Sequence, residues 1–323
     1  MSALRRIAVL TSGGDSPGMN ACIRAVVRSA LYHGLEVYGI RRGYAGLLQE
    51  EVEPMTSLTV GGIINRGGTI LRTARSEDFK TAGGVRKGAE ILARHGIDGL
   101  VIIGGDGSMR GGVELSRISA VRIMGVPATI DNDIPGTDYA IGFDTAVNTA
   151  LDAIDKVRDT AYSHERVFVI EVMGRHKGFI ALEVGLAGGA EAILIPEVPY
   201  DLVDLLDQLH QGYQRSKHSS IIVVAEGACR AEDIKEFLQE HTPYHVRAMV
   251  LGYIQRGGSP TAFDRVLATQ LGAYSVERLL KGHTNEMVGI EGGRLVAVPI
   301  EYIQTTTKTI DVQKLELASK MAI

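Results

Sequence analysis

The strongest constraint on the fold is a regular alternation of short apolar segments with longer amphipathic ones. Residues 7–11, 36–40 and 100–103 are short, apolar and rich in branched side chains, as buried parallel strands are. Longer segments with helical periodicity separate them, and the same alternation continues to Lys281. The pattern therefore predicts an α/β fold in which a mostly parallel sheet carries helices on both faces.

The length of the chain indicates more than one core. A chain of 323 residues exceeds the roughly 250 to 300 residues at which a single core stops growing. The alternation also restarts around residues 138–142, which we take as the candidate junction. We predict two similar three-layer domains, each a mostly parallel sheet with helices on both faces, and a hairpin at residues 288–298 around Gly292-Gly293.

Composition and charge exclude several classes of function. The net charge of −4 gives no electrostatic case for nucleic acid or a membrane surface, and the absence of Trp argues against base stacking. Cys22 and Cys229 have no metal or redox spacing, which fits a reducing cytoplasm, so we expect a cytoplasmic location. The nine histidines show no zinc-binding pair, and no apolar segment is long enough for a membrane helix.

Two polar loops directly follow predicted strands. The first is Gly104-Gly105-Asp106-Gly107-Ser108, and the second runs from Thr129 to Asp133 after Pro127. Ligands of open parallel sheets bind beyond the carboxyl ends of the strands, so both loops should face one crevice. Backbone N–H groups and one carboxylate suit a phosphate chain with its metal, whereas Asp131 and Asp133 suit proton transfer.

A third glycine-rich loop, at residues 11–18, is less specific. Glycines in such a turn serve steric needs as readily as phosphate binding, and both interpretations stay open. We expect Ser16 to cap a helix at residues 19–33 with Pro17 in its first position, residues 41–46 to form a loop, and Ser108 to cap the helix after Gly107. The sequence contains neither a dinucleotide fingerprint nor a P-loop lysine.

Taken together, these motifs resemble the bacterial type of ATP-dependent 6-phosphofructokinase over essentially the whole chain. The resemblance is carried by residues 11–20, 65–69, 104–108, 129–133 with 136–138, 171–175 and 252–260. It implies transfer of a phosphoryl group from ATP to the 1-hydroxyl of fructose 6-phosphate, giving fructose 1,6-bisphosphate in glycolysis. It also implies a homotetramer, an ATP-binding domain at residues 1–138 plus about 255–305, and a fructose 6-phosphate-binding domain at 139–254 plus about 306–323.

The resemblance also implies a role for individual residues. The expected nucleotide-binding residues are Gly14, Tyr44, Arg75, Ser76, Gly105, Asp106, Gly107 and Ser108, with Asp106 holding Mg²⁺. Asp131 would be the general base, assisted by Thr129, Asp133, Arg75 and Arg175. The sugar phosphate would contact Thr129, Ile130, Asp131, Arg166, Met173, Gly174, Arg175, Glu226, Arg247, Tyr253 and Arg256, with Arg166 and Arg247 reaching in from a neighbouring subunit.

Several positions separate this chain from its relatives. Pyrophosphate-using phosphofructokinases tend to carry an Asp and a Lys where this chain has Gly107 and Ala128, so the expected donor is ATP. Tyr253 stands where a histidine is usual, and it cannot become cationic. A nucleotide sensor on the same scaffold remains the alternative class, although it would have no use for Asp131 beside Asp133, and an oxidoreductase is disfavoured.

The resemblance implies an effector site for ADP or phosphoenolpyruvate that is only partly present. Its matching residues are Arg24, Arg28, Arg158, Gly189, Glu191, Arg215 and Lys217. Four positions depart from the family pattern, and most of these changes remove a cationic side chain: Ser57, Gly62, His218 and Ser219. Each lost cation weakens anion binding, so regulation should be weak.

We therefore predict a nearly hyperbolic dependence of initial rate on fructose 6-phosphate concentration, changed little by ADP or phosphoenolpyruvate. Rates measured across a fructose 6-phosphate series, with and without each effector, test this. A strongly sigmoidal curve that ADP straightens would contradict it.

Overall fold

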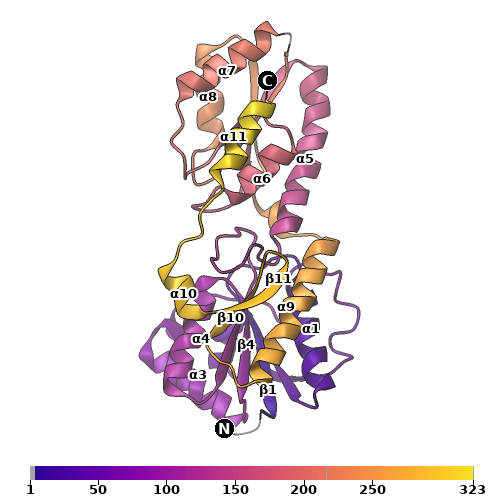
Figure 1. Cartoon of the computed structure of the whole chain (residues 1–323), viewed down its shortest axis with the longest axis vertical. Coiled ribbons are helices and arrows are strands. Elements are labelled where there is room, and N and C mark those ends of the chain that lie inside the picture. The colour runs from indigo at the N-terminus through magenta and orange to yellow at the C-terminus, as the bar shows by residue number, and fades with distance from the viewer. Residues whose placement is uncertain (1–3, 216, 323) are drawn as a thin grey trace. The chain divides into compact units, whose positions relative to one another are not determined.

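The computed structural model describes residues 4–215 and 217–322 of the chain. These residues form two compact units, and each is described by itself. Unit 1 comprises residues 1–129, 134–145 and 256–308, and unit 2 comprises residues 130–133, 146–255 and 309–323, in both cases without the undescribed positions. Each unit has its own mostly or wholly parallel sheet and its own helices, as the alternation predicts (Figure 1).

Unit 1 is built on a seven-stranded sheet with the order β11-β10-β5-β4-β1-β2-β3. Its strands are β1 (Arg6–Ser12), β2 (Glu36–Ile40), β3 (Val52–Met55), β4 (Gly99–Gly104), β5 (Arg122–Pro127), β10 (Glu286–Glu291) and β11 (Arg294–Pro299). The pairs joining β2, β1, β4, β5 and β10 are parallel. The edge strands β3 and β11 pair antiparallel with their neighbours, and β10 with β11 forms the predicted hairpin.

Helices cover both faces of this sheet because its strands are apolar on both sides. The helices are α1 (Met19–Tyr32), α2 (Gly43–Leu48), η1 (Asp78–Lys80), α3 (Ala82–Arg94), α4 (Asp106–Ile118), α9 (Ala262–Leu280) and α10 (Ile300–Thr305). Ile7 and Val9 of β1 pack in one core with α1 and α9, whereas Ala8 and Leu10 pack in the other with α2, α3 and α4. Burying a Val, Leu or Ile side chain stabilises the folded state by about 1.5–3 kcal/mol, so the packing on both faces of the sheet contributes to stability.

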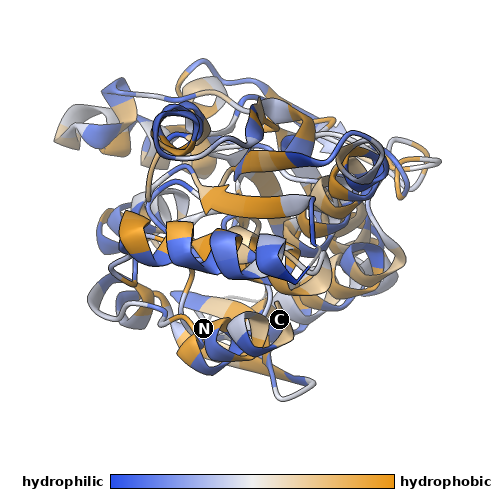
Figure 2. Cartoon of the chain, turned by 90° about the horizontal axis from the view of Figure 1, so that it is seen from above, coloured by the Kyte–Doolittle hydropathy of each residue, from blue (hydrophilic) through white to orange (hydrophobic). Residues whose placement is uncertain are grey.

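Unit 2 has a smaller, wholly parallel sheet with the order β7-β8-β6-β9. Its elements are α5 (Phe143–Ser163), β6 (Arg166–Val172), α6 (Phe179–Ala187), β7 (Ala192–Leu194), α7 (Leu202–Gln214), β8 (Ser220–Ala225), α8 (Ala231–His241), β9 (His245–Val250), η2 (Gly252–Arg256) and α11 (Val312–Met321), with α5 and η2 each sharing residues with unit 1. Leu205 of α7 and Ile234 of α8 pack on alternate residues of β6 and β8. The strands consist mostly of hydrophobic residues, whereas the helices at the surface carry hydrophilic and hydrophobic residues in alternation (Figure 2).

Three local expectations were wrong. Residues 43–48 form helix α2 instead of a loop, because Tyr44 and Leu47 bury their side chains in the core of unit 1. Gly18, in a left-handed conformation, precedes helix α1, and the Ser16 hydroxyl donates to the Ile141 carbonyl instead of capping that helix. Helix α4 begins at Asp106 with Gly105 as its N-cap, so Ser108 lies buried inside the helix.

Asp264 joins two helix starts within unit 1. Its fully buried carboxylate accepts hydrogen bonds from the Gly142 and Thr145 backbone N–H groups, both at 2.8 Å, and from the Thr145 hydroxyl. Burial raises the pKa of the Asp264 carboxyl, and these hydrogen bonds oppose that shift. The carboxylate therefore fixes the residues where α5 begins against the first turn of α9.

We predict that Asp264→Ala lowers the free energy of unfolding by about 2–5 kcal/mol, because each buried N–H group left without an acceptor costs about 1–3 kcal/mol. Chemical denaturation measures the loss. The matched control is Asp204→Ala, an exposed acid in the first turn of α7, which should change stability by less than about 0.5 kcal/mol. Equal effects of the two variants would contradict the structural role.

Candidate functional site

Three neighbouring strands of unit 1 end at the same level of the sheet. Ser12, the last residue of β1, pairs with Gly104, the last residue of β4, and Gly104 pairs in turn with Pro127 at the end of β5. The glycine-rich loop after Ser12, the turn after Gly104 and the segment that starts at Ala128 therefore leave the sheet side by side. The carboxyl ends of parallel strands are where open α/β sheets bind ligands.

The turn after β4 is open to a ligand. A Cβ atom placed on Gly105 or Gly107 would meet nothing within 4 Å, in contrast to most glycines of this unit. Helix α4 starts here, so its first N–H groups and the positive end of its dipole point beyond the strand. This geometry suits the close approach of an anion to the backbone.

Asp106 lies in the first turn of α4 and already has a cationic partner. The Arg110 guanidinium donates to both carboxylate oxygens, with Nε to Oδ1 at 3.1 Å and Nη2 to Oδ2 at 2.7 Å. Both side chains are substantially exposed, at 57% for Arg110 and 40% for Asp106. Sequence reasoning missed Arg110, because a helix starting after Ser108 would have left Asp106 outside the i, i+4 spacing of a helical pair.

Tyr44 supports this turn from behind instead of lining an open surface. Its ring is buried and stacks on Phe79 with 4.0 Å between centroids, and its hydroxyl donates to the Ser108 carbonyl at 2.5 Å. Burial raises the pKa of the Tyr44 hydroxyl, so the group stays a neutral donor. Arg75 is exposed and lines an open hollow of about 740 Å³ with Ser76, whose hydroxyl accepts from the Phe79 N–H.

Hydrogen bonds bring several loops of unit 1 together. The Asn20 amide donates to the Arg66 and Gly67 carbonyls and accepts from the Ile70 N–H at 2.7 Å. The Ser259 hydroxyl donates to the Asn65 carbonyl at 2.5 Å, so the loop at residues 65–69 is fastened to the segment that follows Arg256. The sequence predicts each of these loops but not the contacts between them.

In unit 2, Asp131 is a buried carboxylate with a cation nearby. Its side chain is 6% exposed, and its Oδ2 lies 4.0 Å from Nε of Arg175. Arg175 itself is 60% exposed and has a left-handed backbone with φ of 55°. A buried carboxylate that faces an exposed guanidinium is suited to proton transfer next to a bound anion.

The turn at residues 173–175 is held by two side chains from other segments. Glu226 Oε1 accepts from the Gly174 and Arg175 N–H groups at 3.1 and 2.7 Å, and Gln255 Oε1 accepts from the Met173 N–H at 2.8 Å. Gln255 is fully buried, and its role was not foreseen from the sequence. Glu226, Met173, Gly174, Arg175 and Asp131 therefore form one cluster within unit 2.

Arg166 and Arg247 lie far from this cluster in the same chain. Arg166 is the first residue of the seven-residue strand β6, whereas Met173 follows the last, which puts roughly 20 Å of extended chain between them. Arg247 pairs with Phe168 near the same end, on the edge strand β9. Neither arginine can join residues 173–175 of its own chain.

The residues expected to bind an effector divide between the units. Arg24 and Arg28 lie on α1 in unit 1. In unit 2, Arg158 donates to the Gly188 and Gly189 carbonyls, and Lys217 pairs with Glu191 at 2.9 Å and donates to the Ala322 carbonyl. Arg215 follows α7 and is exposed. Most of these cations of unit 2 are thus engaged within the unit.

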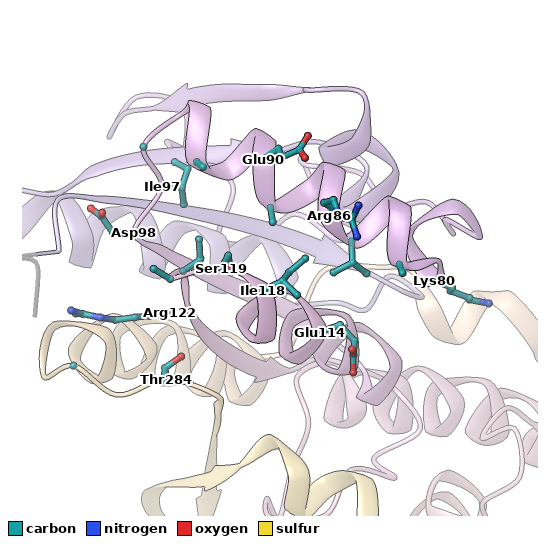
Figure 3. A pocket seen from close by; sticks show the side chains of 18 residues that line it. Lys80, Arg86, Glu90, Ile97, Asp98, Glu114, Ile118, Ser119, Arg122 and Thr284 are labelled. Carbon is teal, nitrogen blue, oxygen red and sulfur yellow. The ribbon is translucent and has the colours of Figure 1, made fainter.

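A hollow of about 1100 Å³ in unit 1 lies away from these residues. It lies between α3 and α4 and is lined by Arg86, Glu114, Asp98 and Arg122 among others (Figure 3). Asp98 precedes β4 and Arg122 begins β5, so this hollow is at the amino ends of the strands. It contains no residue expected to be functional, and we do not assign it to the site.

Comparison with known proteins gives a family match over most of the chain. Residues 6–279 match the family described as Phosphofructokinase. The chain is 55% identical over 320 residues to the ATP-dependent 6-phosphofructokinases of Bacillus pumilus and Bacillus subtilis, covering 99% of this chain and 100% of each relative.

Solved structures agree on the fold. Phosphofructokinase from Saccharomyces cerevisiae superposes with a TM-score of 0.86 and 35% identity, covering 98% of this chain and 46% of the yeast chain. This chain therefore spans less than half of that yeast protein. A pyrophosphate-dependent phosphofructokinase from Marinobacter aquaeolei, at 24% identity and a TM-score of 0.86, shows the fold alone. No helix in residues 4–215 or 217–322 is long and apolar enough to cross a membrane.

Proposed function

Because this chain belongs to the phosphofructokinase family, we propose that it transfers the γ-phosphoryl group of ATP to the 1-hydroxyl of fructose 6-phosphate. The product is fructose 1,6-bisphosphate, and the reaction belongs to glycolysis, which favours a cytoplasmic location. The observation that carries the proposal is the common level at which Ser12, Gly104 and Pro127 end their strands, with Asp131 four residues after Pro127. A coupled assay with fructose 6-phosphate and Mg·ATP tests it directly.

The turn after β4 would bind the phosphates of ATP. The N–H groups of Gly105 and Gly107 belong to the open start of α4, where a polyanion meets backbone donors and the helix dipole, and Ser108 follows them in the first turn. Gly14, Tyr44, Arg75 and Ser76 would complete the nucleotide site, Tyr44 by supporting the Ser108 backbone and Arg75 by offsetting phosphate charge.

Asp106 would hold Mg²⁺ with the help of the nucleotide. The described residues contain no group of three or more His, Cys, Asp or Glu that could hold a metal ion. A single exposed carboxylate fits Mg²⁺, which is commonly bound by one or two carboxylates together with substrate phosphates and water. When bound, the ion would neutralise phosphate charge during the transfer.

Asp131 would act as the general base. It would accept the proton of the sugar 1-hydroxyl as that oxygen attacks the γ-phosphorus, while Arg175 offsets charge on the transferring group. Thr129 and Asp133 would position the reactants, and Met173, Gly174, Glu226 and Ile130 would hold the sugar. Glu226 Oε1 already fixes the turn of Gly174 and Arg175, which supports a preorganised site.

The 6-phosphate would be bound by residues of two subunits. Arg256 and Tyr253 would come from the same chain as Asp131, and Arg166 and Arg247 from a neighbouring subunit of a homotetramer. The separation of roughly 20 Å between Arg166 and Met173 along β6 supports this assignment, because neither Arg166 nor Arg247 can serve its own chain's cluster. ADP or phosphoenolpyruvate would be a weak effector.

We expect Asp131→Ser to lower kcat by roughly 10²- to 10⁴-fold with little change in KM, because a general base acts in the transition state and not in substrate binding. Steady-state kinetics with Mg·ATP measure both constants. Asp207→Ser, an exposed position on α7, is the matched control. A near-normal kcat for Asp131→Ser would remove this residue from the role.

We expect Arg110→Leu to lower the free Mg²⁺ concentration needed for half-maximal nucleotide binding by about two- to fivefold. An exposed ion pair such as Arg110 with Asp106 contributes about 0.2–1 kcal/mol, and Mg²⁺ must displace it. Calorimetric titration with ADP at graded Mg²⁺ concentrations measures the change. Arg117→Leu, which breaks a similar pair with Glu114 on the same helix, should leave the Mg²⁺ requirement unchanged.

A further inference from the structure

The side-chain position of Gly14 is occupied by another residue of unit 1. A Cβ atom built on Gly14 would lie 2.2 Å from Nη1 of Arg256, 3.4 Å from its Cζ and 3.7 Å from its Nη2. The tip of the guanidinium therefore lies against the bare backbone of the loop that follows β1. A distance of 2.2 Å is far below any contact that a real Cβ makes, so a side chain at position 14 and this position of Arg256 exclude each other.

Three other glycines of the loops at this edge of the sheet differ from Gly14. Gly105 and Gly107 have open space where a Cβ would be, as expected for backbone that receives a ligand. Gly13 needs its glycine for another reason, since its φ of 91° is in the left-handed region. Gly14 has no such conformation, so its backbone would accept an alanine, and Arg256 alone accounts for the missing side chain.

The backbones on both sides of this contact are fixed. Gly258, two residues after Arg256, lies so close to Gly67 that a Cβ on Gly67 would be 2.2 Å from the Gly258 carbonyl oxygen. Ser259 donates to the Asn65 carbonyl, and Asn20 of α1 holds the same loop through Gly67 and Ile70. Because these contacts hold the loops, only the flexible end of Arg256 can yield to an added methyl group.

We infer that Gly14 lacks a side chain so that the Arg256 guanidinium can pack against its backbone. Gly14 would thereby act as a positioning residue for the sugar phosphate. The inference rests on the proposed function, in which Arg256 binds the 6-phosphate of fructose 6-phosphate. The bare Gly14 backbone sets how far the guanidinium can retract, and the loop assigned to ATP thereby controls the geometry of the phosphate site. An alanine at position 14 would keep the backbone N–H group that the proposed function assigns to the nucleotide.

The test is a double-mutant cycle with Gly14→Ala and Arg256→Ala. Gly14→Ala should raise KM for fructose 6-phosphate roughly tenfold, the size expected for losing one charge-assisted hydrogen bond, and raise KM for ATP by a smaller factor. In the Arg256→Ala background, Gly14→Ala should have no further effect on KM for fructose 6-phosphate. Gly212→Ala, a helical glycine of α7 with no neighbouring atom nearer than 4.0 Å, controls for the substitution and should move neither constant.

The outcomes separate this inference from the proposed function. Wild-type protein without ATP-dependent activity on fructose 6-phosphate would refute the function itself. If the wild type is active, two results would refute only the positioning role of Gly14. One is that Gly14→Ala raises only KM for ATP, and the other is that the two substitutions raise KM for fructose 6-phosphate independently. Failure of Gly14→Ala to fold, judged by circular dichroism, would also count against the positioning role of Gly14, because only the movable tip of Arg256 should have to shift.

Discussion

The parallel pairing of β1, β4 and β5 is the constraint on which the rest of the site depends. Main-chain hydrogen bonds fix the register so that Ser12, Gly104 and Pro127 end their strands together. A shift of one residue would move the side chains that face one core to the other core, and it would separate the loops at the strand ends. The two apolar cores on either side of the sheet prevent such a shift, so the hydrophobic packing of unit 1 also sets the geometry of its polar edge.

In the proposed function, each unit would prepare a different part of the chemistry. Unit 1 offers an open helix start, a single carboxylate and bare glycines, which are features that receive a charged phosphate chain. Unit 2 holds a buried carboxylate and a turn whose N–H groups are already taken by Glu226 and Gln255. The first arrangement leaves donors free for a ligand, whereas the second uses donors to hold side chains in place. Preorganisation of this second kind reduces the cost of ordering the site when substrate binds.

Cations among the expected active-site and effector residues already have protein partners. Arg110 neutralises Asp106 and Arg175 lies beside Asp131, and among the expected effector residues Lys217 pairs with Glu191. Such pairs keep acidic groups compensated before a ligand binds, and each is exposed enough on one side to exchange its partner. The same property explains why charge alone did not identify partners from the sequence: an arginine near a loop can serve a helix, a carbonyl or a ligand, depending on which group the fold brings within reach.

The sequence by itself determined the α/β class, most strands and helices, and the loops at the strand ends, because short-range periodicity and turn residues specify these features. It did not determine helix α2, the start of α4 at Asp106, or the partners of Gln255, Asp264 and Gly14. Helix α2 is stabilised by the stacking of Tyr44 on Phe79. The other contacts join residues far apart in the sequence, up to the 242 positions that separate Gly14 from Arg256. Only tertiary structure decides such contacts, because they depend on register and packing that no local pattern encodes.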